Sequence, residues 1–166
     1  MQRRTLLKLG LLSTAVLVVA GAVTLRPAFV DGKLIAPARR VMHAVARAVL
    51  DGSLPSDPVA REAALTSHLT RLDATIGGFP APVQAEISQL LTLLATSPGR
   101  RGVANLAAGW EQATVPELQA ALQGMRVSRL ALRQQAYHAL RDLTNAAYYA
   151  DPQAWALLGY PGPRTV

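Results

Sequence analysis

The 166-residue chain contains no cysteine and few aromatic residues, and both shortages narrow what it can do. Without cysteine it can form no disulfide bond and no Cys-ligated zinc, iron–sulfur or c-type haem site. Only 5% of the residues are aromatic, yet three of the four tyrosines and one of the two tryptophans lie between residues 148 and 163. The chain therefore carries no electrons through a cysteine-held cofactor, and its aromatic residues are concentrated near the C-terminus.

Acidic residues are also scarce, because 17 Lys and Arg stand against 10 Asp and Glu, which gives a formal charge of +7. Three of the basic residues and none of the acidic ones lie in residues 1–22, so removal of this segment lowers the charge to +4. The other basic residues are dispersed, and no aromatic-studded sheet face accompanies them. The composition thus argues against a nucleic-acid-binding protein.

Sequence motifs of catalysis are missing as well. The three histidines, His43, His68 and His138, lie on different predicted helices and form no H-E-x-x-H pattern. There is neither a G-x-S-x-G elbow nor a glycine-rich phosphate loop. We therefore expect structural or surface roles for the histidines, and no catalytic residue, metal ligand or bound cofactor in this chain. An enzyme whose site is assembled across helices is the weakest alternative.

Residues 1–25 are predicted to be an export signal or an N-terminal membrane helix. A basic start precedes the uncharged run Leu9–Leu25, which is near the lower limit for a membrane span. The start resembles the bacterial twin-arginine signal, through Arg3, Arg4, Leu6, Leu7 and Lys8. Ala20 and Ala22 supply an A-x-A cleavage pattern, and both cleavage and retention remain open. The expected location is the periplasm, with an ordinary secretory signal as the alternative.

Beyond this segment the sequence predicts an all-α domain, a compact bundle of about six helices over residues 37–166, preceded by a linker at 26–36. Apolar residues recur at helical spacing, and prolines and glycines separate the helical stretches. Asp57 is predicted to be an N-cap, and Thr114 with Glu117 to form a capping box. A short helix is expected to carry Val103, Leu106 and Trp110. The longest helix is expected at 128–149, followed by a short one after Asp151-Pro152.

The end of the chain, "LRDLTNAAYYADPQAWALLGYPGP", resembles the C-terminus of the gluconate 2-dehydrogenase subunit 3 family. In that family a long helix ends in a Gly/Ala-Tyr-aromatic step, and an acidic or serine-rich turn and a Leu-Gly-Tyr-x-Gly close follow. The matching positions are Ala147-Tyr148-Tyr149, Asp151-Pro152 and Leu158 to Pro163. The sequence departs from the family pattern at Ala147, where glycine is common, and at Pro161.

The resemblance implies an accessory, non-catalytic subunit of an exported sugar or alcohol dehydrogenase. Such subunits carry neither flavin nor haem. They bind a large flavoprotein of the glucose-methanol-choline (GMC) type, which holds the FAD, and take it through the twin-arginine translocase in folded form. The resemblance also implies a separate cytochrome c subunit and association with the inner membrane. The alternative function is a stand-alone, membrane-anchored helical binding or scaffold protein of the periplasm.

The aromatic C-terminal residues are the candidate partner-binding site, because aromatic side chains anchor interfaces. The candidates are Tyr148, Tyr149, Trp155, Leu158, Gly159, Tyr160, Pro161, Gly162 and Pro163. The alternative is intramolecular: Tyr148, Trp155 and Tyr160 would then fold back and fill the core of the domain itself. For Tyr160 and the following prolines we favour the partner, because this segment cannot continue a helix.

Overall fold

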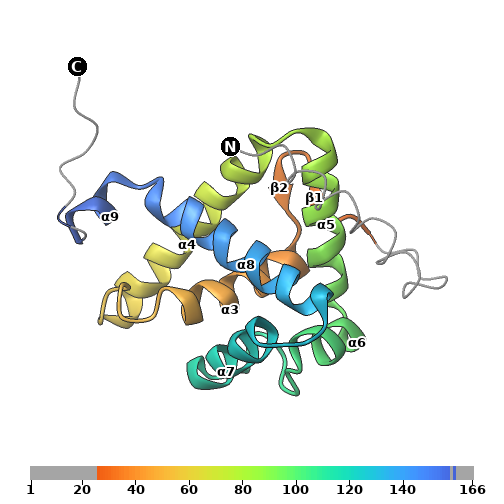
Figure 1. The fold of residues 1–166 in the computed structure, drawn as a ribbon. Helices are drawn as coiled ribbons and strands as arrows, with labels where there is room; N and C mark the ends of the chain where they lie inside the picture. The colour runs from red at the N-terminus through yellow and green to blue at the C-terminus, as the bar shows by residue number, and fades with distance from the viewer. Residues whose placement is uncertain (1–25, 158, 160–166) are drawn as a thin grey trace.

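The structure, a computed structural model, describes residues 26–157 and Gly159. Over these residues it confirms the predicted all-α class, because helices form almost all of the regular structure. In the described part six helices have six or more residues (Figure 1): α3 (Ala36–Val49), α4 (Pro58–Gly77), α5 (Ala81–Ala95), α7 (Val115–Arg126), α8 (Ala131–Tyr149) and α9 (Pro152–Leu157). Between α5 and α7 lie a single turn, α6 (Ser97–Gly99), and a π-helix, η1 (Arg100–Ala104).

Prolines and side-chain caps set the starts of these helices. A proline stands in the first turn of α3, α4, α5 and α7, where its missing N–H costs no hydrogen bond. The Asp57 carboxylate accepts a hydrogen bond from the Ala60 backbone N–H at 2.7 Å. Thr114 and Glu117 form the reciprocal capping box, with the Thr114 N–H donating to Glu117 Oε2 at 2.8 Å. Both predicted caps are therefore confirmed.

Helix α3 is the centre of the bundle, and it packs against α4, α5, α7 and α8. Most of its buried residues have small side chains: Ala38, Val41, Met42, Ala44, Val45, Ala46 and Ala48. Small side chains let the neighbouring helices approach closely and still fill the space between them. The long helices α4 and α8 also lie against each other, with α9 beyond the end of α8 (Figure 1). The bundle thus leaves the C-terminal end of α8 at its edge.

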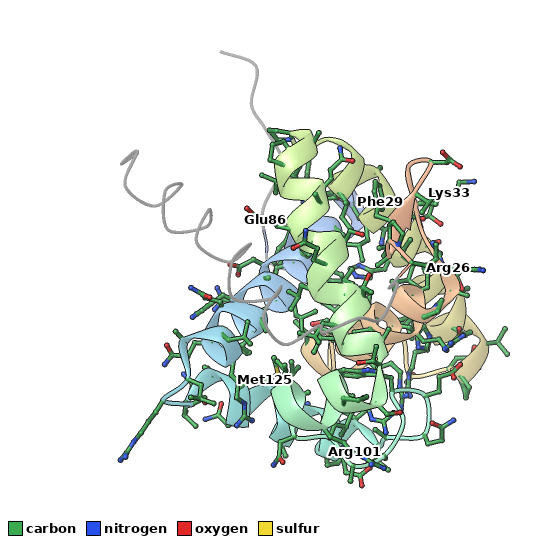
Figure 2. All side chains as sticks on the ribbon, turned by 90° about the vertical axis from the view of Figure 1, so that its right-hand side faces the viewer. Arg26, Phe29, Lys33, Glu86, Arg101 and Met125 are labelled. Carbon is green, nitrogen blue, oxygen red and sulfur yellow. The ribbon has the colours of Figure 1, made fainter. Side chains whose placement is uncertain are left out.

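The segment expected to be a linker, residues 26–36, instead contains a hairpin that is docked on the bundle. Strand β1 (Phe29–Val30) pairs antiparallel with β2 (Lys33–Leu34), and Figure 2 shows this hairpin beside α5. Two distant polar side chains hold it. Ser88 Oγ on α5 accepts a hydrogen bond from the Ala28 N–H at 2.8 Å, and Asp73 Oδ1 on α4 accepts one from the Leu34 N–H at 2.9 Å.

Replacement of Asp73 by alanine is expected to lower the free energy of unfolding by about 2–4 kcal/mol. Asp73 is buried, and its second oxygen pairs with Arg39 Nη1 at 2.6 Å. Its loss leaves the buried Leu34 N–H without an acceptor and Arg39 without its counter-charge. Urea unfolding measures the loss, and hydrogen exchange at the Leu34 amide should become faster.

Asp142→Ala is the matched control for this prediction, because Asp142 also pairs with an arginine, Arg141, at 2.7 Å, but on the exposed face of α8. Exposed pairs of this kind contribute little, and we expect a loss below about 1 kcal/mol. Equal losses for the two variants would show that Asp73 is not what holds the hairpin to the bundle.

Three helix boundaries differ from those predicted. Val103 lies in η1, but Leu106 and Trp110 are buried outside any helix, because Asn105 takes a left-handed conformation (φ 54°) that ends η1. The Trp110 indole N–H instead donates to the Leu94 carbonyl at 2.8 Å, which fixes this irregular segment on α5. Helix α7 continues past Gly124 to Arg126, and α8 begins at Ala131 rather than at 128.

Candidate functional site

The C-terminal arm, which we define as residues 148–157 together with Gly159, lies at the edge of the bundle. A tight turn joins α8 to α9, in which the Asp151 N–H donates to the Tyr148 carbonyl at 3.2 Å and the Ala154 N–H donates to the Asp151 carbonyl at 3.0 Å. Figure 1 shows α9 beyond the end of α8, on the side of the molecule away from α5 and α7. The arm therefore extends the bundle and does not enter its centre.

Tyr148 faces the bundle. Its half-buried ring packs against a small cluster that includes Leu50 and Leu65, and its hydroxyl donates to the Ser53 carbonyl at 3.4 Å. The residue thereby ties the end of α8 to the connection between α3 and α4. Tyr148 therefore packs against the domain itself, as in the intramolecular alternative to partner binding.

Tyr149 and Trp155 are the other two aromatic residues of the arm. Tyr149 is 44% exposed, and its ring meets that of Tyr148 edge to face at 5.3 Å between centroids. The Trp155 indole N–H donates to the Tyr149 carbonyl at 2.8 Å, and its side chain is half-buried. This bond holds α9 against the last turn of α8, so that Tyr149 and Trp155 form one preorganised aromatic element. Gly159 follows with φ +65°, a conformation that favours glycine.

The remaining predicted site residues lie outside the residues that the structure describes. These are the signal residues Arg3, Arg4, Leu6, Leu7 and Lys8, the cleavage candidates Ala20 and Ala22, and the C-terminal residues Leu158, Tyr160, Pro161, Gly162 and Pro163. The candidate membrane segment Leu9–Leu25 also falls there. Of the helices in the described part, none combines the length and the apolar character needed to cross a membrane.

A cavity of about 500 Å³ lies where the arm meets the middle of α4. Apolar side chains from the α3–α4 connection, from α4 and from α9 form much of its lining, among them Leu50, Leu54, Ala63, Ala64 and Ala154. Its polar lining comes mainly from Ser53, Ser67, His68, Arg71, Tyr148 and Asp151. The cavity therefore has an apolar wall and a compact group of polar side chains.

His68 is the unusual member of this group. The residue is only 1% exposed, and neither of its ring nitrogens has a hydrogen-bond partner in the structure. Burial, with a smaller contribution from the positive charge of Arg71, lowers the pKa of the imidazole from 6.5 to about 4. At neutral pH the ring is therefore uncharged, with one nitrogen available as a donor and the other as an acceptor.

An ion pair lines the cavity on the side of the arm. Arg71 Nη1 lies 3.0 Å from Asp151 Oδ2, and Arg71 Nε donates to the Ala147 carbonyl at 3.2 Å. Both contacts join α4 to the end of α8. Because the pair is neutral overall and His68 is uncharged, the polar part of the cavity carries no net charge at pH 7.

No motif marks His68 in the sequence, but its spacing indicates that it is buried. His68 follows Leu65 by three residues and precedes Leu72 by four, so that it belongs to the buried stripe of α4. The other two histidines agree with the expected surface roles. His138 is exposed, and His43 Nε2 lies 3.2 Å from Glu62 Oε1 on the surface between α3 and α4.

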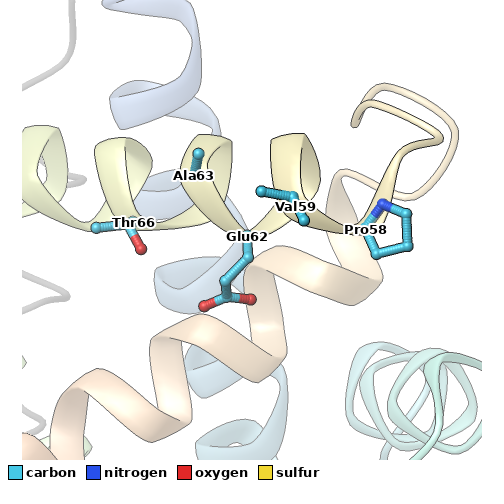
Figure 3. Close-up of a pocket in the computed structure, with 5 residues that line it drawn as sticks. All are labelled: Pro58, Val59, Glu62, Ala63 and Thr66. Carbon is cyan, nitrogen blue, oxygen red and sulfur yellow. The ribbon is translucent and has the colours of Figure 1, made fainter.

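The first turns of α4 carry a second, open depression of about 620 Å³ that continues from the cavity through Ala63 (Figure 3). Val59 is 79% exposed there, and Glu62 is directed toward α3. This part of α4 lacks a covering element in the described structure. Across the same described residues, no group of three or more histidine or acidic side chains is placed to hold a metal ion.

Comparison of the chain with known protein families, with curated proteins and with solved structures gave no match.

Proposed function

We propose that this chain is a non-catalytic accessory subunit of an exported FAD-dependent sugar or alcohol dehydrogenase. It binds the folded flavoprotein subunit in the cytoplasm and supplies the twin-arginine signal that takes both chains to the periplasm. The proposal rests on a resemblance to the gluconate 2-dehydrogenase subunit 3 family. Residues 137–163 and the N-terminal signal carry this resemblance.

The C-terminal arm is the observation that carries this proposal. Its aromatic residues could all have been used to fill the core of the domain, but only Tyr148 packs against a core cluster. Tyr149 is exposed, and its carbonyl is bound by Trp155. Rigid, partly exposed aromatic residues are typical anchors of protein interfaces, because they cover much area at a small cost in rotamer entropy.

The export route fits a partner that must fold first. The twin-arginine signal is an address read by a receptor, and the route transports folded proteins. A flavoprotein has to fold around its FAD before transport, so that one signal on a bound subunit serves both chains. The proposal assigns partner binding to the arm and recognition by the translocase to Arg3 and Arg4, which belong to opposite ends of the sequence.

Substitution of Tyr149 and Trp155 tests the proposal. We expect Tyr149→Ala combined with Trp155→Ala to weaken the complex by about 2–4 kcal/mol, which corresponds to a loss of more than about tenfold in affinity. The measurement is the amount of FAD-containing large subunit that is recovered with the affinity-tagged chain. Circular dichroism should show that the variant keeps its helical content.

Phe79→Ala is the control, because Phe79 is an exposed aromatic residue in the turn between α4 and α5, outside the arm. We expect this variant to retain the flavoprotein fully. If both variants retain it equally, the arm is not the docking element. If the unsubstituted chain is recovered alone and colourless, a stand-alone binding or scaffold protein becomes the better interpretation.

A further inference from the structure

The connection between α7 and α8, residues 127–130, exposes two large apolar side chains. Val127 is 62% exposed and Leu130 is 63% exposed. The backbone between them is held in place, because the Ser128 N–H donates to the Met125 carbonyl at 3.2 Å and the Leu130 N–H donates to Ser128 Oγ at 3.2 Å. Exposed apolar residues are usually scattered singly over a protein surface, so two of them within one short connection call for an explanation.

Basic residues accompany these apolar side chains. Arg126 and Arg129 are exposed within the same stretch, and Arg133 follows in the first turn of α8. The sequence contains no aspartate or glutamate from residue 118 to residue 141. The acidic residue that precedes this stretch, Glu117, is held in the capping box at the start of α7. This end of the bundle is therefore positively charged over a continuous part of the chain.

The protein does not neutralise these charges itself. None of the ion pairs in the described part of the chain includes Arg126, Arg129 or Arg133. Arg126 Nε donates to Gln123 Oε1 at 2.9 Å, and Arg133 Nε donates to the Val103 carbonyl at 2.8 Å, so that both face uncharged acceptors. The combination of exposed apolar side chains with unneutralised arginines matches a surface that is negatively charged outside and apolar beneath.

The position of the connection favours a membrane over a folded protein as this surface. Figure 2 shows the junction of α7 and α8 at the lower left edge of the molecule, whereas Lys33 lies toward the upper right. A stable protein interface takes about 20–30 residues from each side, far more than a four-residue connection supplies. A fluid bilayer closes around a small protruding segment, and its anionic headgroups attract basic residues.

We propose that the α7–α8 connection docks on the surface of a membrane that contains anionic phospholipids. Val127 and Leu130 enter the boundary between headgroups and acyl chains. Arg126 and Arg129 bind the lipid phosphates. The C-terminal arm lies at the other end of α8, a helix of 19 residues or about 28 Å, so that both surfaces are available at once. The inference does not rest on the proposed function, because it requires neither the flavoprotein nor the export signal.

A fluorescent label at residue 130 tests the insertion. The chain has no cysteine, so Leu130→Cys gives a single site for a nitrobenzoxadiazole label. The full chain is incorporated into vesicles of phosphatidylethanolamine and phosphatidylglycerol that carry spin labels on their acyl chains. We expect the emission to shift to shorter wavelength and to be quenched by the spin labels. The control is the same label at Val59→Cys, an exposed position on α4, which should be neither shifted nor quenched.

Variants at exposed positions separate the two contributions. One basic residue near an anionic membrane contributes about fivefold to binding. We therefore expect Arg129→Gln to lower the ratio of inserted to free label about fivefold, and Arg126→Gln together with Arg129→Gln to lower it about twentyfold. Val127→Asp should prevent insertion. Lys33→Gln is the matched control, because it removes one exposed positive charge on another side of the molecule and should leave the ratio unchanged.

Three results would overturn the proposal. The first is a label at residue 130 that is quenched no more than the label at residue 59. The second is equal quenching in vesicles of phosphatidylcholine alone, or quenching that survives loss of both arginines. The third is a label that responds to the purified flavoprotein subunit but not to vesicles. In that case the connection is a protein-docking surface, and the proposed function stands without membrane docking.

Discussion

Lowering the pH from 7 to 4 is expected to reduce the free energy of unfolding by about 3 kcal/mol through His68 alone. In the unfolded chain this histidine binds a proton near pH 6.5, whereas in the folded protein its pKa is about 4. Between these values the unfolded state binds more protons, so that stability falls as the solution becomes more acidic. The contribution is fully present above pH 6.5, and it is lost progressively down to the folded pKa.

The physical cause is the place of His68 in the cavity. Burial disfavours the charged imidazolium, and Arg71, one turn further along α4, adds a smaller unfavourable interaction between like charges. Asp151, on the other side of the cavity, is held by Arg71 at 3.0 Å. The same carboxylate therefore does not offset the cost of protonating His68.

Urea unfolding of His68→Leu, compared with the unsubstituted protein at pH 7, 5 and 4, isolates this effect. Carboxylates that titrate near pH 4 are common to both proteins, so that they cancel in the difference between them. We expect the acid destabilisation of the variant to be smaller by about 3 kcal/mol at pH 4. His138→Gln, at an exposed position, should behave like the unsubstituted protein. An acid loss in His68→Leu as large as that of the unsubstituted chain would show that His68 is not the responsible group.

Replacement of Arg3 and Arg4 together by lysine is expected to abolish export of this chain. Lysine keeps the positive charge, but it lacks the planar guanidinium with its fixed set of donors. A receptor that recognises the arginine pair therefore loses its contacts, although the hydrophobic run Leu9–Leu25 is unchanged. Under the proposed function, the flavoprotein subunit should remain in the cytoplasm together with the variant.

Cell fractionation followed by immunodetection measures both chains. Arg26→Lys is the matched control, since it makes the same chemical change outside the signal motif, and it should leave export intact. If the lysine pair still directs the chain to the periplasm, the segment acts as an ordinary secretory signal. If the chain is trapped but the flavoprotein still appears in the periplasm, the two are not exported together.

The helices could be predicted from the sequence because their determinants are local. The stripe through Leu65, Leu69, Leu72 and Ile76 marks the buried face of α4, and all four residues are buried. The capping pair Thr114 and Glu117 lies within one turn, so that its geometry depends on neighbouring residues only. Periodicity and caps therefore located the helices of the bundle to within a few residues at most ends.

The hairpin and the irregular segment after α5 could not be predicted in this way, because distant side chains hold them. Strands of two residues have too short a pattern to recognise, and the bonds that fix them come from Ser88 and Asp73, which lie 60 and 39 positions further along the chain than the residues they bind. Trp110 was expected on a helix because its spacing suited one. Its actual place depends on a hydrogen bond to Leu94, 16 positions away.

The C-terminal arm and the cavity differ in the same way, because the arm consists of neighbouring residues and the cavity of residues that are distant in the sequence. The sequence predicts the arm as a binding site because its residues are contiguous and the resemblance covers them, and this stays a prediction; the different positions of Tyr148 and Tyr149 became visible only in the structure. The cavity brings together residues from α3 to α9, and no local pattern signals it. Only the position of His68 in the apolar stripe of α4 could have indicated a buried polar group.

Flavin absorbance of the purified chain tests the central claim most directly. The affinity-tagged, unsubstituted protein is extracted from the membrane and periplasmic fractions under mild conditions and analysed by size-exclusion chromatography. We expect a yellow complex in which this chain elutes together with a larger, FAD-containing chain. A colourless preparation in which this chain elutes alone, from cells that produce the flavoprotein, would contradict it.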